Sequence, residues 1–415
     1  MSTHPDGCEA RRPLASADVG PAWLRGGRIP CLDGVRALAI LLVLFHHVTF
    51  PGVGWGPVEA IHDRCGSLGV QIFFVLSGFL ITTLMLREVE KTGRLSLGQF
   101  YWRRFLRIVP VYFAYLVVLG VLQAWGRTHL DERAWLALGT YTVNFMTTAR
   151  PHAIAHVWSL SVEEHFYVVW PLLMAFWTPG RCRNAALASV VSALGLRWLG
   201  PLAFPDSIYA PQWPFWTFTR MDDIAVGCLL AFLARDAAWR RRLDWFVADG
   251  RRLALTATAF LASQLLVSHQ VGGSLLPPVS LKLLRGLAND VNTVGMAVML
   301  WAVLVRPGGA AGRVLNYPLV RGVGVISYSL YLWHPLFCGN DSDWLCRFPQ
   351  NLVPMFVAAC LSYFLIEKPF LSLKARVGRP APVAAPQAGP GRNKKAALTV
   401  SGGGRPCASG APATS

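Results

Sequence analysis

The stretch LDGVRALAILLVLFHH, residues 32–47, carries the features that decide the fold class. Its middle, from Leu38 to Phe45, is entirely apolar, yet Arg36 and His47 belong to the same run. These two residues are eleven positions apart, which at 100° per residue is three helical turns plus roughly 20°. A helix would therefore place both on one face, about 16 Å apart along its axis.

An ionisable residue inside an apolar helix is costly and needs a reason. The stripe formed by Arg36 and His47 could hold the anionic head of an acyl donor at the guanidinium and place the reacting end near the imidazole. The alternative is an arginine that snorkels to the membrane surface and a histidine that bonds a neighbouring helix. The spacing alone leaves both interpretations open.

The composition of the whole chain points to an integral membrane protein. The 415 residues are 53% hydrophobic and 15% charged, with a mean hydropathy of +0.41, whereas about 25% of residues are charged in a soluble domain. No compact soluble surface could hide this surplus of apolar residues, and disorder requires low hydrophobicity. The nine cysteines include no Cys-x-x-Cys pair, so no metal site is expected.

The positive charge marks loops of a membrane protein. The net charge is +17, and its basic residues cluster between apolar runs, which is typical of cytoplasmic loops and argues against nucleic-acid binding. Runs of roughly 20 apolar residues can cross a bilayer. The candidate spans are 33–50, 68–86, 105–125, 160–176, 185–202, 223–233, 253–267, 291–305, 323–337 and 352–366.

A shorter apolar stretch, 134–146, decides the topology. If it spans the membrane, the later basic loops all face outward; if it lies at the interface, all basic loops and both termini are cytoplasmic. The sequence therefore predicts an all-α, polytopic membrane bundle of about ten transmembrane helices, residues 30–375. Residues 1–29 are expected to form a disordered cytoplasmic arm, and residues 376–415 a disordered basic tail.

Two further groups of charged residues stand inside predicted spans. Arg104 and Arg107 are three apart, hence on one helix face, where paired guanidinium groups suit phosphate; the alternative is a role in topology alone. Glu163 and Glu164 enter a span beside His165 and could orient a histidine, receive a proton or bind a sugar. A structural ion pair with an arginine is the alternative.

Other polar residues receive more modest predictions. One span carries a polar stripe that suits the lining of a cavity, formed by Ser327, Tyr328, Tyr331 and His334. Arg220, Asp222 and Asp223 are expected to form a mostly structural ion pair. Glu367 and Lys368 are expected to anchor the last span at the interface, with Pro369 ending the helix. Cys338 and Cys346 fall in a predicted outer loop, where a disulfide is an open alternative.

Several motifs, taken in order, resemble those of a known family. LDGVRA…FHH is followed by GVQIFFVLSGFLI (69–81), RRFLRIVP (103–110), WSLSVEEHFY (158–167), ISYSLYLWH (326–334) and IEKP (366–369). This series resembles the integral-membrane acyltransferase-3 family, including its Arg-ten-residues-His spacing, over residues 30 to 370. The chain departs at His165, where the family has Gln. The resemblance also implies about ten spans.

The resemblance implies transfer of an acetyl or short acyl group from acyl-CoA to a hydroxyl of a carbohydrate or glycosylated acceptor. A cell-envelope sugar and a macrolide-type product of antibiotic biosynthesis are both compatible acceptors. The enzyme would lie in the bacterial inner membrane, with acyl-CoA as co-substrate and no permanently bound cofactor.

The charged residues inside the predicted spans suggest a mechanism for this transfer, which is a hypothesis. Arg36, Arg104 and Arg107 would hold the donor's phosphates, and His47 would act as general base or accept the acyl group itself. Glu163 or Glu164 would hold the histidine or the acceptor. The alternative from another class is a transporter or flippase, in which the same charges line a path without chemistry. The oligomeric state is left open.

Overall fold

The protein is described by a computed structural model that covers residues 20–48, 57–147, 150–203, 213–266, 278–338 and 344–377. Helices make up nearly all of this part of the chain, and it contains no strand. The α-helices are α1 (Ala22–Arg25), α2 (Leu32–His47), α3 (Pro57–Thr92), α4 (Leu97–Ala124), α5 (Glu132–Gly139), α6 (His152–Ala155), α7 (Val157–Phe176), α8 (Pro179–Ala203), α9 (Thr217–Leu233), α10 (Ala237–Ala248), α11 (Gly250–Leu266), α13 (Pro278–Val305), α14 (Ala310–Leu315), α15 (Pro318–Val325), α16 (Ser327–Trp333), α17 (Leu352–Ser362) and α18 (Lys368–Val377).

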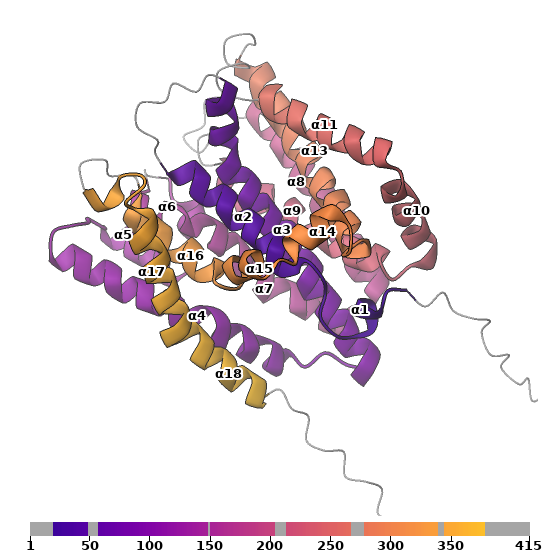
Figure 1. Ribbon diagram of the computed structural model, residues 1–415, viewed down its shortest axis with the longest axis horizontal. Coiled ribbons are helices and arrows are strands. Elements are labelled where there is room, and N and C mark those ends of the chain that lie inside the picture. The colour runs from indigo at the N-terminus through magenta and orange to yellow at the C-terminus, as the bar shows by residue number, and fades with distance from the viewer. Residues whose placement is uncertain are drawn as a thin grey trace, which may run out of the picture.

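The bundle is organised around α2 and α3. Figure 1 shows these two helices in the centre, with α4, α17 and α18 on one side and α8, α11 and α13 on the other. One apolar core fills the space between α2, α3, α4, α7 and α16, and a second lies between α3, α9 and α13. Because α3 contributes to both cores, it joins the two halves of the bundle.

Glycine lets α3 and α9 pack with their backbones almost touching. A Cβ on Gly78 would lie 1.9 Å from the carbonyl oxygen of Ile224, and one on Gly227 would lie 2.0 Å from that of Val75. Any larger side chain at these two positions would force the helices apart, because the clashing atoms belong to the backbone. The two glycines thus fix the distance between the halves.

The expectation of about ten spans is not confirmed. Among the described residues, four helices are long and apolar enough to cross a membrane: Arg64–Thr92, Leu97–Ala124, Leu283–Val305 and Leu352–Leu373. Helix α2 has only 16 residues, fewer than the roughly 20 that a bilayer requires. The predicted run 323–337 is broken into α15, α16 and the 3₁₀ helix His334–Phe337. The weak stretch 134–146 forms the eight-residue α5 and a 3₁₀ turn, too short to span.

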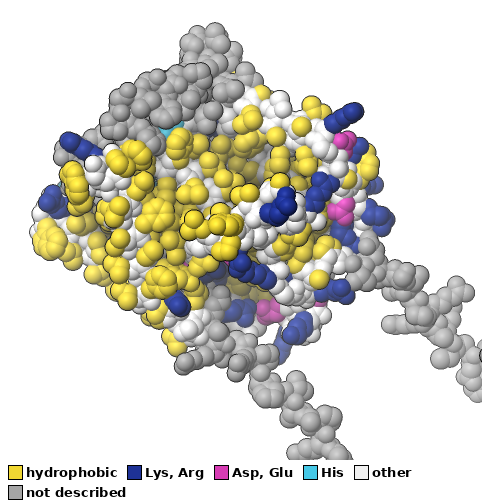
Figure 2. Space-filling view, viewed as in Figure 1, with side chains coloured by type: hydrophobic (Ala, Val, Ile, Leu, Met, Phe, Trp, Pro, Cys, Tyr) yellow, Lys and Arg dark blue, Asp and Glu magenta, His cyan; other side chains and the backbone are white. Residues whose placement is uncertain are grey.

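The outer surface suits a lipid environment. Large apolar side chains on α4 and α17 are exposed, among them Phe113 at 64% and Val353 at 68%. Figure 2 shows this apolar expanse on the left of the face, while Lys and Arg gather toward the right and lower edges, around α10 and α14. This separation of apolar from basic surface is typical of a membrane protein with basic residues at the interface.

Two sequence expectations fail at the ends of the described chain. Residues 20–29 are not a disordered arm, because Trp23, Leu24 and Ile29 are buried and the Trp23 ring packs 5.8 Å from Phe79 between centroids. Pro369 does not end the last helix, which continues as α18 through Val377. Residues 1–19 and 378–415 lie outside the described residues. Cys338 and Cys346 do not form a disulfide with each other, and the Cys346 thiol donates to the carbonyl of Leu336 at 3.8 Å.

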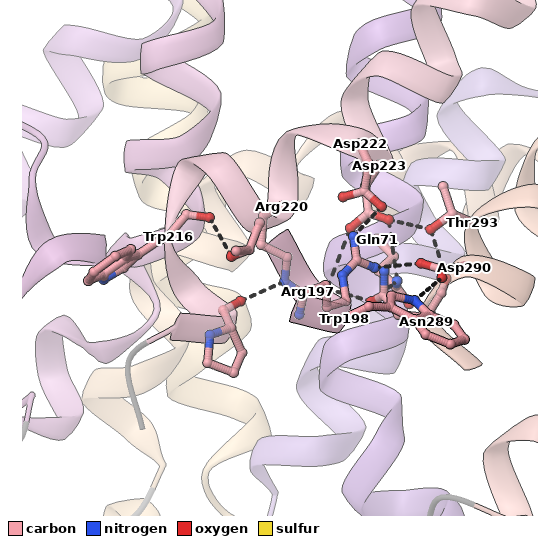
Figure 3. A network of polar contacts seen from close by, with 12 residues as sticks. Gln71, Arg197, Trp198, Trp216, Arg220, Asp222, Asp223, Asn289, Asp290 and Thr293 are labelled. Atoms are coloured by element: carbon pink, nitrogen blue, oxygen red, sulfur yellow. Dashed lines mark hydrogen bonds and ion pairs between the residues drawn. The ribbon is translucent and has the colours of Figure 1, made fainter. Parts of the chain in front are cut away.

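Arg220, Asp222 and Asp223 belong to a larger buried network than the single ion pair predicted. Arg197 of α8 contacts Asp222 of α9 at 2.5 Å and Asp290 of α13 at 2.8 Å. Arg220 contacts Asp223 at 3.5 Å and donates to Asn289 at 2.8 Å. Figure 3 shows these side chains meeting Gln71, Trp198 and Thr293 between α3, α8, α9 and α13. The network therefore ties four helices together.

Replacing Arg197 by methionine is expected to lower the free energy of unfolding by about 3 kcal/mol, because it leaves the buried Asp222 and the partly buried Asp290 without their partner. The measurement is the thermal midpoint of the detergent-purified protein. Arg183→Met, an exposed arginine on the same helix, is the matched control and should change it little. Equal midpoints for the two variants would show that the network contributes nothing to stability.

Candidate functional site

A cavity of about 840 Å³, its open mouth included, lies between α2, α3, α4, α7 and α16. It brings together eight of the residues singled out from the sequence. These are Arg36, Arg104, Arg107, Glu163, Glu164, Ser327, Tyr328 and Tyr331. The apolar part of the wall comes mainly from α3, through Val70, Phe73, Phe74, Leu76 and Leu80.

Three arginines form a cationic cluster in this cavity. Arg36 comes from α2, whereas Arg104 and Arg107 lie one turn apart on α4. Arg107 interacts electrostatically with both of the others. None of the three forms an ion pair with a carboxylate of the described chain. Like charges held together at low dielectric repel, so an anion in the cavity would stabilise the cluster.

The two glutamates of α7 lie beside the arginines. Glu163 accepts a hydrogen bond from the Ser77 hydroxyl at 2.7 Å and interacts electrostatically with all three arginines. Glu164 interacts electrostatically with Arg104, whose guanidinium stacks on the Tyr167 ring at 3.9 Å. The carboxylates thus offset part of the cationic charge from the opposite wall without closing ion pairs across the cavity.

Tyr331 forms one end of the cavity. Its hydroxyl lies 2.5 Å from Ser159 Oγ and donates to the carbonyl of His156 at 3.1 Å. Tyr328 donates to the carbonyl of Ile108 at 3.1 Å, and Ser327 is buried beside it. The polar stripe predicted for 326–335 therefore lines the cavity through three of its four residues.

His47 and His334 lie beyond this wall and do not line the cavity. His334 follows Tyr331 by one turn, begins the 3₁₀ helix His334–Phe337 and is completely buried. The rings of His47 and His334 are 4.7 Å apart between centroids. The site thus has a cationic cavity and a neighbouring group of histidines. Tyr331, which lines the cavity, lies 5.6 Å from the His334 ring between centroids.

The geometry of His47 leaves one ring nitrogen free for chemistry. Nδ1 lies 2.9 Å from the carbonyl of Val43, which can only accept, so Nδ1 carries the hydrogen. The Nε2 atom of the neutral ring then has a lone pair, and no residue of the described chain bonds it. His165, where the sequence departs from the family, instead lies 2.7 Å from the Thr217 hydroxyl.

Glu367 is a polar residue of the site region that the sequence expectation misplaced. It is not an interfacial anchor: it is 2% exposed and accepts a hydrogen bond from Ser329 at 3.0 Å. It also interacts electrostatically with Arg107 and Arg36. The π-helical turn Tyr363–Glu367 turns it inward. The only sequence feature that could have pointed to a site role for Glu367 was its place in the IEKP motif, residues 366–369.

The described chain is a helical bundle in which four helices are long and apolar enough to cross a membrane. Arginines and glutamates surround a cavity inside this bundle. These features define a polytopic membrane protein with a polar site among its helices. A family model described as an acyltransferase domain matches residues 29–366. The chain therefore belongs to the acyltransferase-3 family.

Three relatives extend this assignment. The chain is 28% identical to the peptidoglycan O-acetyltransferase OatA of Listeria monocytogenes, over 82% of this chain and 55% of that protein. It is 30% identical to the putative peptidoglycan O-acetyltransferase YrhL of Bacillus subtilis, over 82% and 54%, and 25% identical to the O-acetyltransferase OatA of Staphylococcus aureus, over 82% and 57%. The chain thus spans about half the length of these relatives. No solved structure matches it.

Proposed function

We propose that this protein is a membrane O-acyltransferase that moves an acetyl or short acyl group from acyl-CoA to a hydroxyl of a carbohydrate. The observation that supports the proposal best is the cavity that joins Arg36, Arg104 and Arg107 to Glu163 and Glu164. It offers cationic ligands for an anionic donor and carboxylates for a polar acceptor in one space, in a chain of an acyltransferase family.

The arginine cluster would bind the donor. Acyl-CoA carries phosphates, and guanidinium groups bind phosphate through paired, charge-assisted hydrogen bonds. Three arginines without carboxylate ion pairs are ready for such an anion, and the apolar wall from α3 suits the acyl chain and its thioester. The donor would enter from the cytoplasmic side, with both termini on that side.

His47 would act as the general base. Its Nε2 would take the proton of the acceptor hydroxyl while the oxygen attacks the thioester carbonyl; the carbon–sulfur bond then breaks, and the thiolate leaves and finally receives the proton. The backbone carbonyl of Val43 holds the tautomer that this step needs. Because His47 does not line the cavity, the thioester would have to extend beyond the cavity wall to meet its Nε2.

The relatives' names favour a cell-envelope carbohydrate as acceptor over a macrolide or another secreted metabolite. A chromosomal deletion tests this choice. Mass spectrometry of cell-wall glycans and of secreted metabolites from deletion and parent strains should show the loss of one O-linked acyl group from the glycans. Loss from a metabolite alone would contradict the proposed acceptor, and no lost acyl group in either pool would favour the transporter alternative.

A further inference from the structure

Histidines gather at one end of the bundle more densely than one general base requires. Six of the ten in the chain meet there: His46, His47, His62, His152, His156 and His334. They come from α2, α3, α6, the start of α7 and the 3₁₀ helix His334–Phe337. The described residues contain no group of three metal-ligating side chains placed to hold an ion.

His334 is the nearest of these rings to His47. Its centroid lies 4.7 Å from that of His47, against 4.8 Å for His46 and 6.2 Å for His152. The His334 Nδ1 atom lies 2.7 Å from the carbonyl of Tyr331, so it carries the hydrogen, as Nδ1 of His47 does toward the carbonyl of Val43. Both rings therefore have the lone pair on Nε2.

The Nε2 atom of His334 has no hydrogen-bond partner within the described chain, and the residue is 0% exposed. A buried ring nitrogen without a partner costs free energy and calls for an explanation. Among the rings that contact His47, His334 alone combines complete burial with such an atom. A proton arriving on His47 would provide the missing partner.

We propose that His334 is a positioning residue that shares the proton His47 takes from the acceptor hydroxyl. When Nε2 of His47 gains that proton, the ring becomes a cation with a donor at Nε2, and Nε2 of His334 accepts from it. The proton is held between the two rings until it passes to the departing thiolate, so no further reactant is needed. This inference rests on the proposed role of His47.

The place of His334 in the chain supports this function. Tyr331 lines the cavity with its ring and holds Nδ1 of His334 with its carbonyl, so one residue fixes both the cavity wall and the histidine behind it. The side chains that face the pair carry no negative charge. They are the imidazoles of His46, His62, His152 and His156 and the phenol of Tyr331, which keeps its hydroxyl hydrogen. No carboxylate of the described chain shares the proton in place of His334.

The test compares two substitutions of His334 in the full chain in membranes, with acetyl-CoA as donor and isolated peptidoglycan glycan strands as the acceptor probe. His334→Asn keeps a donor near the Tyr331 carbonyl and removes the acceptor at Nε2, whereas His334→Gln places an amide oxygen near the Nε2 position. Asn is expected to lower kcat about tenfold with the donor KM unchanged, and Gln to restore part of the rate. Rates are measured per folded protein, and His129→Asn, on an exposed loop, is the control that keeps full activity.

The pH–rate profile separates a shared proton from a merely structural role. His334 stabilises the protonated form of His47, so without it His47 stays deprotonated to lower pH, and the acid limb should move down by about one pH unit. A loss by the same factor at every pH, or an unchanged profile, would overturn the inference. If Asn fails to fold, His334→Ala, which also lacks an acceptor at the Nε2 position, takes its place, and an unshifted profile for that variant decides against the inference. Wild-type protein that transfers no acyl group would instead refute the proposed function.

Discussion

Replacing His47 by alanine is expected to reduce acyl transfer at least a hundredfold, while the protein stays folded in the membrane. Removal of a general base costs about 10²- to 10⁴-fold in rate. His47 stands at the last turn of α2 with Nδ1 fixed by Val43, so the substitution removes one half-buried ring and leaves the helix intact. The measurement is the initial rate of transfer from labelled acetyl-CoA to carbohydrate in isolated membranes.

The neighbouring His46 supplies the matched control for this substitution. It lies on the same turn of α2, with Nδ1 3.1 Å from the carbonyl of His62, and it has no role in the proposed chemistry. His46→Ala should therefore keep most of the activity. Full activity of His47→Ala, or equal losses for the two variants, would refute the assignment of His47 as the base.

Replacing Arg104 or Arg107 by methionine is expected to raise the donor KM about 10- to 100-fold, since a hydrogen bond to a charged group contributes about 1.5–3 kcal/mol. Methionine keeps the length and apolar packing of the side chain. Because the cluster is made of repelling cations, each variant should fold at least as stably as the natural protein. Thermal midpoints measured alongside the kinetics check this second expectation.

Arg94 is the control for the arginine variants. It is exposed in the connection between α3 and α4, close in sequence to the cluster but outside the cavity. Arg94→Met should leave the donor KM unchanged. If the Arg104 and Arg107 variants also keep the natural KM, the cluster does not bind the donor's phosphates.

The sequence predicted the composition of the cavity better than its shape. Arg36, Arg104 and Glu163 line one cavity. Each lies on a helix face that follows from the 3.6-residue period, and such faces can be predicted from the sequence. That His47 does not line the cavity could not be predicted from the sequence, because the rings around it, among them His152 and His334, come from distant segments of the chain. Such contacts are set by packing between segments distant in sequence.

The errors elsewhere have local physical causes. On a regular helix, Glu367 would lie at the membrane interface as the sequence predicted. The π-helical turn Tyr363–Glu367 adds one residue to the turn and rotates the Glu367 side chain toward the interior. Residues 20–29 read as disordered from their Pro, Gly and Arg content, yet three apolar side chains, Trp23, Leu24 and Ile29, suffice to hold the segment on the bundle. Average composition conceals such single anchoring residues.

The measurement that tests the central claim most directly is the fate of a labelled acetyl group. Sealed, inside-out membrane vesicles that contain the protein receive acetyl-CoA labelled in the acetyl carbon, together with the carbohydrate acceptor. The account predicts alkali-labile label on the acceptor and an equal amount of free thiol, both lost in His47→Ala. Acceptor that crosses the membrane without gaining label, while acetyl-CoA remains intact, would contradict it.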